Sequence, residues 1–445
     1  MYLAACQKQA GHAVKIIDTR LSLMRPETLA RTARTFSPDI IGISALLLEA
    51  RNFHENAAAL RAAFPKAPII GGGPYASSCP EHMLKDENIT CAVPGEGEIK
   101  FQDLVSRLES NIDFNDVEGL AVRENGAVRL TPQRSYIADL DTLPFPEWDS
   151  IDIKAYYRTN RFSNMPPGPY MAIFTSRSCP YQCIYCHKIF GKAFRARTPE
   201  NVIQEFRTIV NRYNIRDFEI MDDCFNFDAD RAALICDLIR DANLGIKLSF
   251  PNGVRADRLD DALIRKIKDA GTQYMAIAVE TGVPRVQKLI RKNLDLAKVK
   301  HVIRFATRAG IFCHGFFMLG FPTETADEMR QTVRYATQSR LHTAAFFIAK
   351  PVPGTPMHTM TFGADQPHIS EEFQDYCYTS MDLQSSDLSA VAIQNIYHSA
   401  YFRFYLNPFR VFRILLAFPH KSFLFFSFVH LLARFMRSPR VKSRK

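Results

Sequence analysis

Three closely spaced cysteines are the residues of this chain whose types and spacing point most directly to chemistry. Cys179, Cys183 and Cys186 form a C-x3-C-x2-C run within residues 178–187. Three thiolates can hold an iron-sulfur cube and leave one iron without a protein ligand, whereas a structural zinc site takes four protein ligands. The alternative is a zinc knot completed by His187. The run favours a cluster with an open iron that another molecule completes.

With Tyr185 just before the last cysteine, the run resembles the cluster motif of the radical S-adenosylmethionine (radical SAM) superfamily. In that family the amine and carboxylate of SAM occupy the open iron. The resemblance implies a [4Fe-4S] cluster on the three cysteines and one-electron cleavage of SAM to a 5'-deoxyadenosyl radical. That radical attacks an unreactive C–H bond or drives methyl transfer. An electron donor such as flavodoxin or ferredoxin is the expected partner.

From residue 170 onward, strand and helix signals alternate. Helices are expected at 199–213 and 229–241, among others, and the cysteine loop follows the first strand. Parallel barrels carry their chemistry at the carboxyl ends of their strands. The pattern predicts a partial, open (β/α)6 barrel over about residues 166–360, with strands at 170–175, 218–221, 247–251, 273–279, 312–318 and 343–349.

Polar or glycine residues follow the other predicted strands, and together with Tyr185 they look like the SAM-holding positions of the family. The positions are Asp222, Asp223, Arg255, Glu280 and Gly320. By this resemblance one of the two aspartates meets the methionyl amine. Glu280 then meets the ribose or amine, and Gly320 admits the adenine. Taken singly, each carboxylate is equally compatible with a helix cap or an ion pair. The Asp-Asp pair replaces the Gly-Gly-Glu of many members, and no second cysteine cluster is evident.

The first 110 residues predict a Rossmann-like α/β domain. Short apolar runs at 13–17, 39–44 and 67–71 alternate with helical stretches at 26–36 and 51–64, as in a parallel sheet covered by helices on both faces. Ligands of such sheets lie beyond the carboxyl ends of the strands. Three loops are expected there, and they carry Ser44, Leu46, Gly71, Gly72, Gly73, Gly95 and Glu96.

These loops resemble the S-x-L and glycine-pair elements of the cobalamin-binding domain. The resemblance implies that cobalamin is a further cofactor bound near these seven residues. That fold normally opens with a strand, but residues 1–10 read as a helix, so its first strand is apparently missing. His54 lies in a helical run and is interpreted as an ordinary surface or core residue rather than a cobalt ligand.

A connecting region at 111–165 separates the two predicted domains. Residues 119–123 and 127–130 flank Asn125-Gly126, the signal of a β-hairpin. A proline-bearing stretch at 140–148 excludes helix. Four regions are therefore predicted: a cobalamin-binding-like domain at 1–110, the linker, the barrel, and a helical region at 361–445.

Composition excludes several classes of protein. The chain has 445 residues, enough for two or three domains, and ten cysteines that are mostly scattered through apolar segments. This usage fits a reducing cytosol, and no export signal is visible. The net charge of +10 equals the ten Lys and Arg residues from Arg403 onward, because no Asp or Glu follows Asp387. A nucleic-acid surface is therefore not expected on the main body.

The basic tail contains an apolar run at 422–433 that is free of charge. A membrane-spanning helix needs about 20 apolar residues, so this run is too short to cross a bilayer. Asn407-Pro408 predicts the start of a helix just before it. Residues 401–445 suit either a helical surface lying on an anionic membrane or helices packed against the barrel.

Together these observations predict a cytoplasmic enzyme, in peripheral contact with the membrane if the tail binds lipid. It resembles the cobalamin-linked radical SAM group, which includes anaerobic magnesium-protoporphyrin ester cyclases and carbon methyltransferases. Methyl transfer to an unactivated carbon of a small or lipid-like substrate is the first hypothesis, and radical cyclisation or oxidation is the second. A tRNA methylthiotransferase and a non-enzymatic electron carrier are the weaker alternatives.

Overall fold

The computed structural model describes residues 1–133, 136–159, 161–163, 165–363, 369–370 and 373–419. Its contacts divide the chain into two units. The first unit comprises Met1–Thr159, His187–Gly191 and His368–Gln374. The second comprises Asn160–Cys186, Lys192–Pro367 and Asp375–Lys445.

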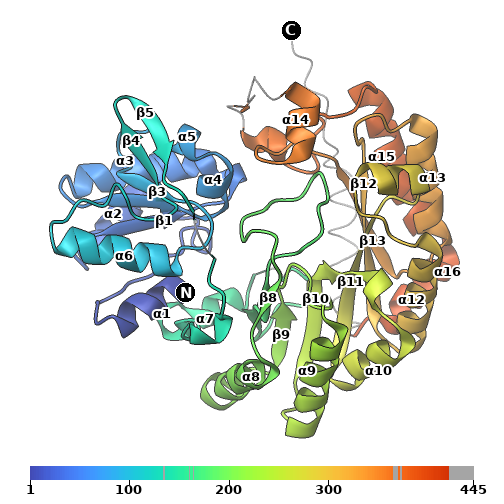
Figure 1. Ribbon diagram of the computed structural model, residues 1–445. Coiled ribbons are helices and arrows are strands. Elements are labelled where there is room, and N and C mark those ends of the chain that lie inside the picture. The colour runs from blue at the N-terminus through green and yellow to red at the C-terminus, as the bar shows by residue number, and fades with distance from the viewer. Residues whose placement is uncertain (134–135, 160, 164, 364–368, 371–372, 420–445) are drawn as a thin grey trace. The chain divides into compact units, whose positions relative to one another are not determined.

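The first unit is built on a five-stranded sheet in the order β1-β2-β3-β4-β5 (Figure 1). Its strands are β1 (Ile41–Ser44), β2 (Ile69–Gly72), β3 (Cys91–Val93), β4 (Ala121–Glu124) and β5 (Ala127–Leu130). The first three strands are parallel, which confirms the predicted Rossmann-like sheet. The predicted hairpin is β4–β5, and it extends this sheet by antiparallel pairing of Ala121 with Ala92 of β3.

The strand predicted at residues 13–17 is wrong. These residues form no regular element, and none of them is fully buried. The segment runs beside the second helix, where the Lys15 ammonium donates to the Thr35 hydroxyl at 2.9 Å. A short apolar run becomes a strand only where a neighbouring strand supplies ladder hydrogen bonds, and within the described residues β1 pairs with β2 alone.

Helices cover both faces of the first sheet. Phe101 and Leu104 pack with Ile70 and Val122 on one face. On the other face, a Cβ at Gly71 would lie 2.3 Å from Met83 Sδ. The helical elements are α1 (Tyr2–Gln9), α2 (Pro26–Arg34), η1 (Leu47–Glu49), α3 (Ala50–Ala63), α4 (Gly73–Ser78), α5 (Pro80–Met83), α6 (Glu98–Glu109), η2 (Leu140–Thr142), η3 (Trp148–Ser150) and α7 (Ile153–Tyr156). The short 3-10 helix η2 shows that the expectation of no helix at 140–148 is wrong for its first three residues.

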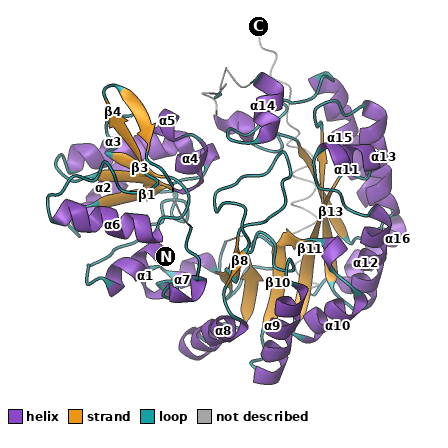
Figure 2. Cartoon of the chain, viewed as in Figure 1, coloured by secondary structure: helices purple, strands orange, loops and turns teal. Residues whose placement is uncertain are grey.

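The second unit is a six-stranded parallel sheet curled into a partial barrel, in the order β13-β12-β11-β10-β9-β6 (Figure 1, Figure 2). Every neighbouring pair is parallel, as the sequence predicted. The strands are β6 (Met171–Ile173), β9 (Asp217–Ile220), β10 (Lys247–Val254), β11 (Thr272–Glu280), β12 (Phe312–Leu319) and β13 (Thr343–Ile348), and a small pair is formed by β7 (Ser176–Arg177) and β8 (Arg195–Ala196).

The barrel helices begin and end where local side chains dictate. Thr198 caps α8 by accepting from the N–H of Asn201, Pro199 is the first helical residue, and Asn214 ends the helix in a left-handed conformation. The helices are α8 (Pro199–Tyr213), α9 (Ala229–Ala242), η4 (Ala256–Arg258), α10 (Asp261–Asp269), α11 (Pro284–Leu289), α12 (Leu296–Arg308), α13 (Ala326–Gln338), α14 (Pro356–Phe362), η5 (Phe373–Tyr376), α15 (Ala390–Tyr405) and α16 (Pro408–Ala417).

Helices α15 and α16 pack at the β13 edge of the barrel. The Tyr405 and Tyr401 hydroxyls of α15 accept from the N–H groups of Ala344 and Phe346 on the free edge of β13. Asn407 caps α16, as predicted. The buried Arg410 of that helix donates to the carbonyls of Thr337, Ser339 and Leu341. The predicted apolar run at 422–433 lies outside the described residues.

Candidate active site

The cysteine triplet lies on the loop between β7 and β8, drawn in green in Figure 1, at the carboxyl end of the first barrel strand. Cys179, Cys183 and Cys186 are free thiols and are half-buried. The N–H of Cys186 donates to the carbonyl of Cys183 at 3.2 Å, which closes a turn. Of the seven cysteines outside this loop, six are fully buried and Cys377 is half-buried, so the triplet is the set of accessible cysteines that are also closely spaced.

The surroundings of the triplet were not foreseen from the sequence. A hydrogen bond from the Cys224 thiol lowers the pKa of Cys179 to about 6. Burial raises the pKa of Cys186 to about 12, and the positive charge of Lys192 opposes this rise. Three thiols on one loop match the donor chemistry of an iron-sulfur cluster. Among the described residues, no three Cys, His, Asp or Glu side chains are grouped as ligands of a single metal ion, and each cluster thiolate binds an iron of its own.

The two aspartates after β9 hold the start of the cysteine loop. Asp222 is buried and accepts 2.6 Å hydrogen bonds from the Thr175 N–H, the Thr175 hydroxyl and the Ser176 hydroxyl. Asp223 accepts from the N–H of Ser178 at 3.1 Å and keeps an exposed side chain. Asp222 is thus occupied by the protein itself, and Asp223 is the aspartate with surface available to a ligand.

Glu280 ends β11 in a left-handed backbone conformation, with φ of 66°. For a residue other than glycine this conformation is strained, and such strain occurs frequently at functional sites. The Lys292 ammonium donates to Glu280 Oε1 at 2.8 Å and lies 3.4 Å from the Tyr185 hydroxyl. The sequence signalled Glu280 and Tyr185, but not the lysine that joins them.

Arg255 follows β10 and is already bound on several sides. Its guanidinium donates to the Lys292 carbonyl at 2.6 Å and lies 3.4 Å from the centre of the Tyr181 ring. It also pairs with Asp257. These contacts connect the cysteine loop, through Tyr181, to the segment that carries Lys292.

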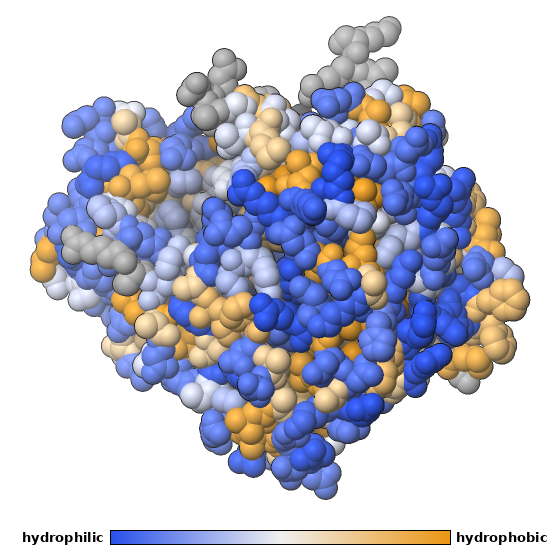
Figure 3. Space-filling model, turned by 45° about the vertical axis from the view of Figure 1, so that its right-hand side comes forward, coloured by the Kyte–Doolittle hydropathy of each residue, from blue (hydrophilic) through white to orange (hydrophobic). Residues whose placement is uncertain are grey.

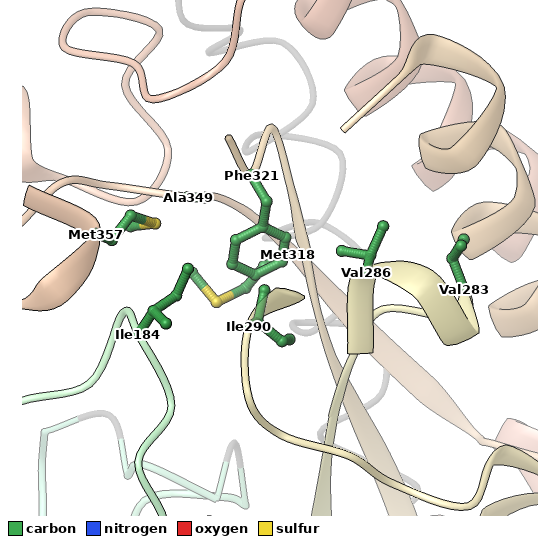
Figure 4. Packing of buried hydrophobic residues seen from close by; sticks show 8 residues of the cluster. All are labelled: Ile184, Val283, Val286, Ile290, Met318, Phe321, Ala349 and Met357. Atoms are coloured by element: carbon green, nitrogen blue, oxygen red, sulfur yellow. The ribbon is translucent and has the colours of Figure 1, made fainter. Parts of the chain in front are cut away.

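Gly320 follows β12 directly and has a φ of +85°, which glycine adopts without strain. The N–H groups of Gly320 and Phe321 donate to one carboxylate oxygen of Glu324. Phe321 faces the Tyr185 ring, with centroids 5.7 Å apart. Figure 4 shows Phe321 with Met318 and with Ile184 of the cysteine loop in one apolar cluster, which supports this side of the site.

The residues predicted to bind cobalamin lie at the carboxyl edge of the first unit's parallel strands. A Cβ at Gly73 would lie 2.4 Å from Ser44 Oγ, so this glycine serves the protein's own packing. At Gly72 the nearest atom would be 4.0 Å away, so this backbone leaves room for a ligand. The Gly72 carbonyl accepts from the N–H of Ala45 at 3.5 Å, and the next residue, Leu46, is exposed. An open glycine next to an exposed leucine fits an extended cofactor tail.

Gly95 and Glu96 serve the fold of this unit more directly. Gly95 has φ of +73°, and its N–H donates to the Ser77 hydroxyl at 2.9 Å. Glu96 is buried and accepts from the N–H of Ile137 at 3.0 Å. Glu96 thus ties the segment after the hairpin to the loop that follows β3.

A hydrogen-bonded chain in the first unit was missed by sequence reasoning. His54, interpreted as an ordinary residue, bonds Asp86 Oδ2 at 2.7 Å through Nδ1 and the Tyr75 hydroxyl at 2.9 Å through Nε2. Tyr75 is fully buried, and its hydroxyl lies 2.7 Å from His82 Nδ1. The position of His54 within its helix did not indicate these contacts, because its hydrogen-bond partners lie in other segments of the chain.

Two stretches of this chain match known protein families. Residues 173–336 match the radical SAM superfamily, and residues 1–105 match the B12-binding domain. The chain thus contains a radical SAM domain. It also has an amino-terminal B12-binding domain, as the sequence predicted. The cofactors of the cobalamin-linked radical SAM group are a [4Fe-4S] cluster, SAM and cobalamin.

Several relatives share most of the length of this radical SAM enzyme. An uncharacterized methyltransferase of Pyrococcus horikoshii is 28% identical over 410 residues, covering 92% of this chain and 87% of the relative. The anaerobic magnesium-protoporphyrin IX monomethyl ester cyclase of Cereibacter sphaeroides is 25% identical over 366 residues, covering 80% and 58%. The methyltransferase TsrM of Kitasatospora setae, solved with cobalamin and a [4Fe-4S] cluster, shares the fold with a TM-score of 0.68, 18% identity, and coverage of 81% and 74%.

Proposed function

We propose that this radical SAM enzyme is a cobalamin-dependent methyltransferase acting on an unactivated carbon of a small-molecule substrate. The observation that carries the proposal is the accessible cysteine loop at the carboxyl edge of the barrel, in a chain that also has a B12-binding domain. When bound, the cluster supplies one electron to cleave SAM, and cobalamin carries the methyl group.

Within this proposal Cys179, Cys183 and Cys186 hold the cluster, and Asp223 receives the methionyl amine of SAM. A carboxylate is the matching partner for an ammonium group. Asp222 positions the loop rather than contacting SAM, because its carboxylate already accepts three hydrogen bonds.

The remaining SAM contacts are proposed at the ends of β11 and β12. Glu280, held by Lys292, faces the ribose or amine, and Gly320 leaves room for the adenine. Tyr185 packs between these two strand ends, beside Phe321. Arg255 acts by fixing Lys292 and the cysteine loop.

Cobalamin is proposed to bind at the strand edge of the first unit. Ser44, Leu46 and Gly72 are its contacts, and Gly71 and Gly73 allow the strands and helices to pack closely beneath it. Gly95 and Glu96 shape the neighbouring loop.

Anaerobic reconstitution with iron, sulfide and cobalamin tests the proposal. The protein is expected to take up a [4Fe-4S] cluster and cobalamin, and the electronic spectrum of the cluster should change when SAM is added. Reduced protein should then release 5'-deoxyadenosine. Zinc in place of iron, or a cluster whose spectrum ignores SAM, contradicts the proposal.

A radical cyclase or oxidase is the second candidate, because similarity to the Cereibacter cyclase extends over 80% of this chain. The two candidates differ in what SAM leaves behind. Methyl transfer from SAM leaves S-adenosylhomocysteine, and reductive cleavage leaves methionine and 5'-deoxyadenosine. The methyltransferase is expected to form both nucleoside products in the presence of reduced cobalamin, whereas a cyclase forms 5'-deoxyadenosine alone.

We also propose that a low-potential protein such as flavodoxin or ferredoxin supplies the electron that cleaves SAM.

A further proposal is that the carboxyl-terminal helices touch an anionic membrane. No helix among the described residues is long and apolar enough to cross a bilayer. However, Phe409 and Phe412 of α16 are 80% and 60% exposed, and Leu406 before it is 73% exposed. Figure 3 shows apolar patches among polar ones on one face of the molecule.

Charge supports a lipid surface as the occupant of this exposed face, since every charged residue after Asp387 is basic. The full chain should sediment with vesicles containing phosphatidylserine, and the variant F409S/F412S should sediment less. Sedimentation that is unaffected by the substitutions, or equal on neutral vesicles, contradicts membrane contact through this face. Dimer dissociation in the variant would identify a second copy of the chain as the occupant instead.

A further inference from the structure

The segment from residue 375 to residue 388, named here the cover segment, lies across the carboxyl ends of the last two barrel strands. The N–H of Ile348, at the end of β13, donates to the Tyr378 carbonyl at 2.8 Å. Further along, a Cβ at Gly320 would lie 3.9 Å from Ser386 Cβ. The cover segment thus reaches from the end of β13 to the glycine at the end of β12.

Three tyrosines together satisfy the free edge of β13. The N–H groups of Ala344 and Phe346 bond the Tyr405 and Tyr401 hydroxyls, and that of Ile348 bonds the Tyr378 backbone. The first two tyrosines use their side chains for this purpose. Tyr378 uses only its main chain, so its hydroxyl remains available for another partner.

A buried lysine fixes the cover segment. Lys350 is 1% exposed, and its ammonium donates to the carbonyls of Asp382 and Leu383, the latter at 3.1 Å. Burial lowers the pKa of Lys350 to about 8, and the nearby Asp382 opposes this shift. Burying an ammonium group is costly unless it makes hydrogen bonds. Here both hydrogen bonds go to the backbone of the cover segment, so Lys350 holds this segment in place.

Tyr378 lies at the carboxyl end of β13 and is 38% exposed. Its ring packs on Phe347, with centroids 6.0 Å apart, and Phe347 packs against the apolar cluster that contains Ile184 of the cysteine loop. Burial raises the pKa of Tyr378 to about 12, and Cys186 and Glu280 add to this rise. No hydrogen bond of its hydroxyl to another described residue is present. The phenol is therefore one aromatic contact away from the cluster that supports the cysteine loop, and its hydroxyl is open to a ligand.

We propose that Tyr378 is a SAM-binding residue contributed from outside the barrel strands, and that Lys350 is the positioning residue that holds it there. The phenol hydroxyl donates a hydrogen bond to bound SAM, which offers carboxylate and ribose oxygens as acceptors. This inference rests on the proposed function, because it requires SAM to bind beside Cys186 and Glu280.

Equilibrium binding of radiolabelled SAM to the anaerobically reconstituted full chain tests the assignment. A net hydrogen bond contributes about 0.5–1.5 kcal/mol, which corresponds to roughly a 2- to 13-fold change in affinity. Tyr378→Phe is expected to weaken SAM binding by a factor in this range while iron content stays at the wild-type level. Tyr405→Phe is the matched control. It removes a tyrosine hydroxyl from the same edge of β13 and should leave SAM affinity unchanged.

Lys350→Met should also weaken SAM binding, because the cover segment loses its anchor. If Lys350 acts through Tyr378, the two losses are not additive. The double variant Y378F/K350M should then bind SAM with the same affinity as whichever single variant binds it less tightly. Wild-type affinity in Y378F overturns the inference and leaves the proposed function intact, and loss of iron in Y378F shows a structural role instead. If the wild-type protein fails to bind SAM at all, the proposed function is wrong.

Discussion

Glu324 is buried in the turn after β12, where one carboxylate oxygen accepts from two backbone N–H groups. The other oxygen has no hydrogen-bond partner among the residues that the structure describes. Burial raises the pKa of Glu324 to about 7. A carboxyl with a raised pKa binds its proton more tightly in the folded state than in the unfolded chain. Its contribution to stability is therefore complete below the unfolded pKa and is lost as the pH rises through the folded pKa.

As the pH rises from about 4.5 to about 7, the free energy of unfolding should therefore decrease by about 1–3 kcal/mol because of Glu324. Glu324→Gln keeps an oxygen for the two N–H groups and does not titrate, so its stability curve should be flatter over this interval. Urea unfolding at several pH values measures the difference. Parallel curves for the two proteins would contradict the assignment.

A second prediction concerns the Tyr75 hydroxyl, which lies between two histidines in the first unit. Tyr75→Phe leaves the packing of the ring intact but removes the shared partner of His54 and His82. A buried polar group left without its partner costs about 1–3 kcal/mol. Thermal or urea unfolding should show a loss of this size. His54→Ala in the Y75F background should then add less than it does alone, because the two residues belong to one network.

At the scale of the element, the cysteine loop depends on the turn after β9. Asp222→Ala removes the acceptor of the Thr175 N–H and of two hydroxyl groups. We expect a loss of about 2–5 kcal/mol and a lower iron content after reconstitution, because the start of the loop is released. Asp222→Asn keeps one oxygen for the N–H group, and the hydroxyls can turn to accept from its amide. It should therefore retain more iron than the alanine variant, and equal iron in both variants argues against a positioning role.

The elements of the barrel could be predicted from sequence because each carries its own local signal. Residues 199–213 have a Thr-Pro start and an Asn end, and the helix observed there has these bounds. The run at 13–17 shows the limit of this reasoning, since an apolar run becomes a strand only beside a partner. The polar contacts in the site could not be predicted for the same reason, because they depend on partners that no local signal identifies. Lys292 and Glu280 are near in the chain, but nothing in their spacing indicates a buried ion pair.

At the scale of the whole molecule, each unit is assembled from distant parts of the chain. The hairpin at 121–130, predicted as part of a linker, extends the first sheet. Residues 368–374 also belong to the first unit, more than two hundred residues beyond its main segment. No pattern in the sequence signals such a return, because one aromatic residue in a polar stretch has no periodicity. Phe373 is that residue, and it is buried against Tyr75 and His82, with ring centroids 5.7 and 5.1 Å away.

This return predicts that Phe373 stabilises the first unit rather than the barrel that precedes it in the chain. Truncation of a buried Phe to Ala typically costs about 3–5 kcal/mol. Phe373→Ala should therefore speed hydrogen exchange in α4 and α5, where its ring partners lie, and leave β11 and β12 at wild-type rates. Exchange measured by mass spectrometry on the full chain resolves these peptides. Phe362→Ala, in α14 of the second unit, is the control and should leave α4 and α5 unaffected. Faster exchange in the barrel strands of F373A, or unchanged exchange in α4 and α5, would show that the segment does not belong energetically to the first unit.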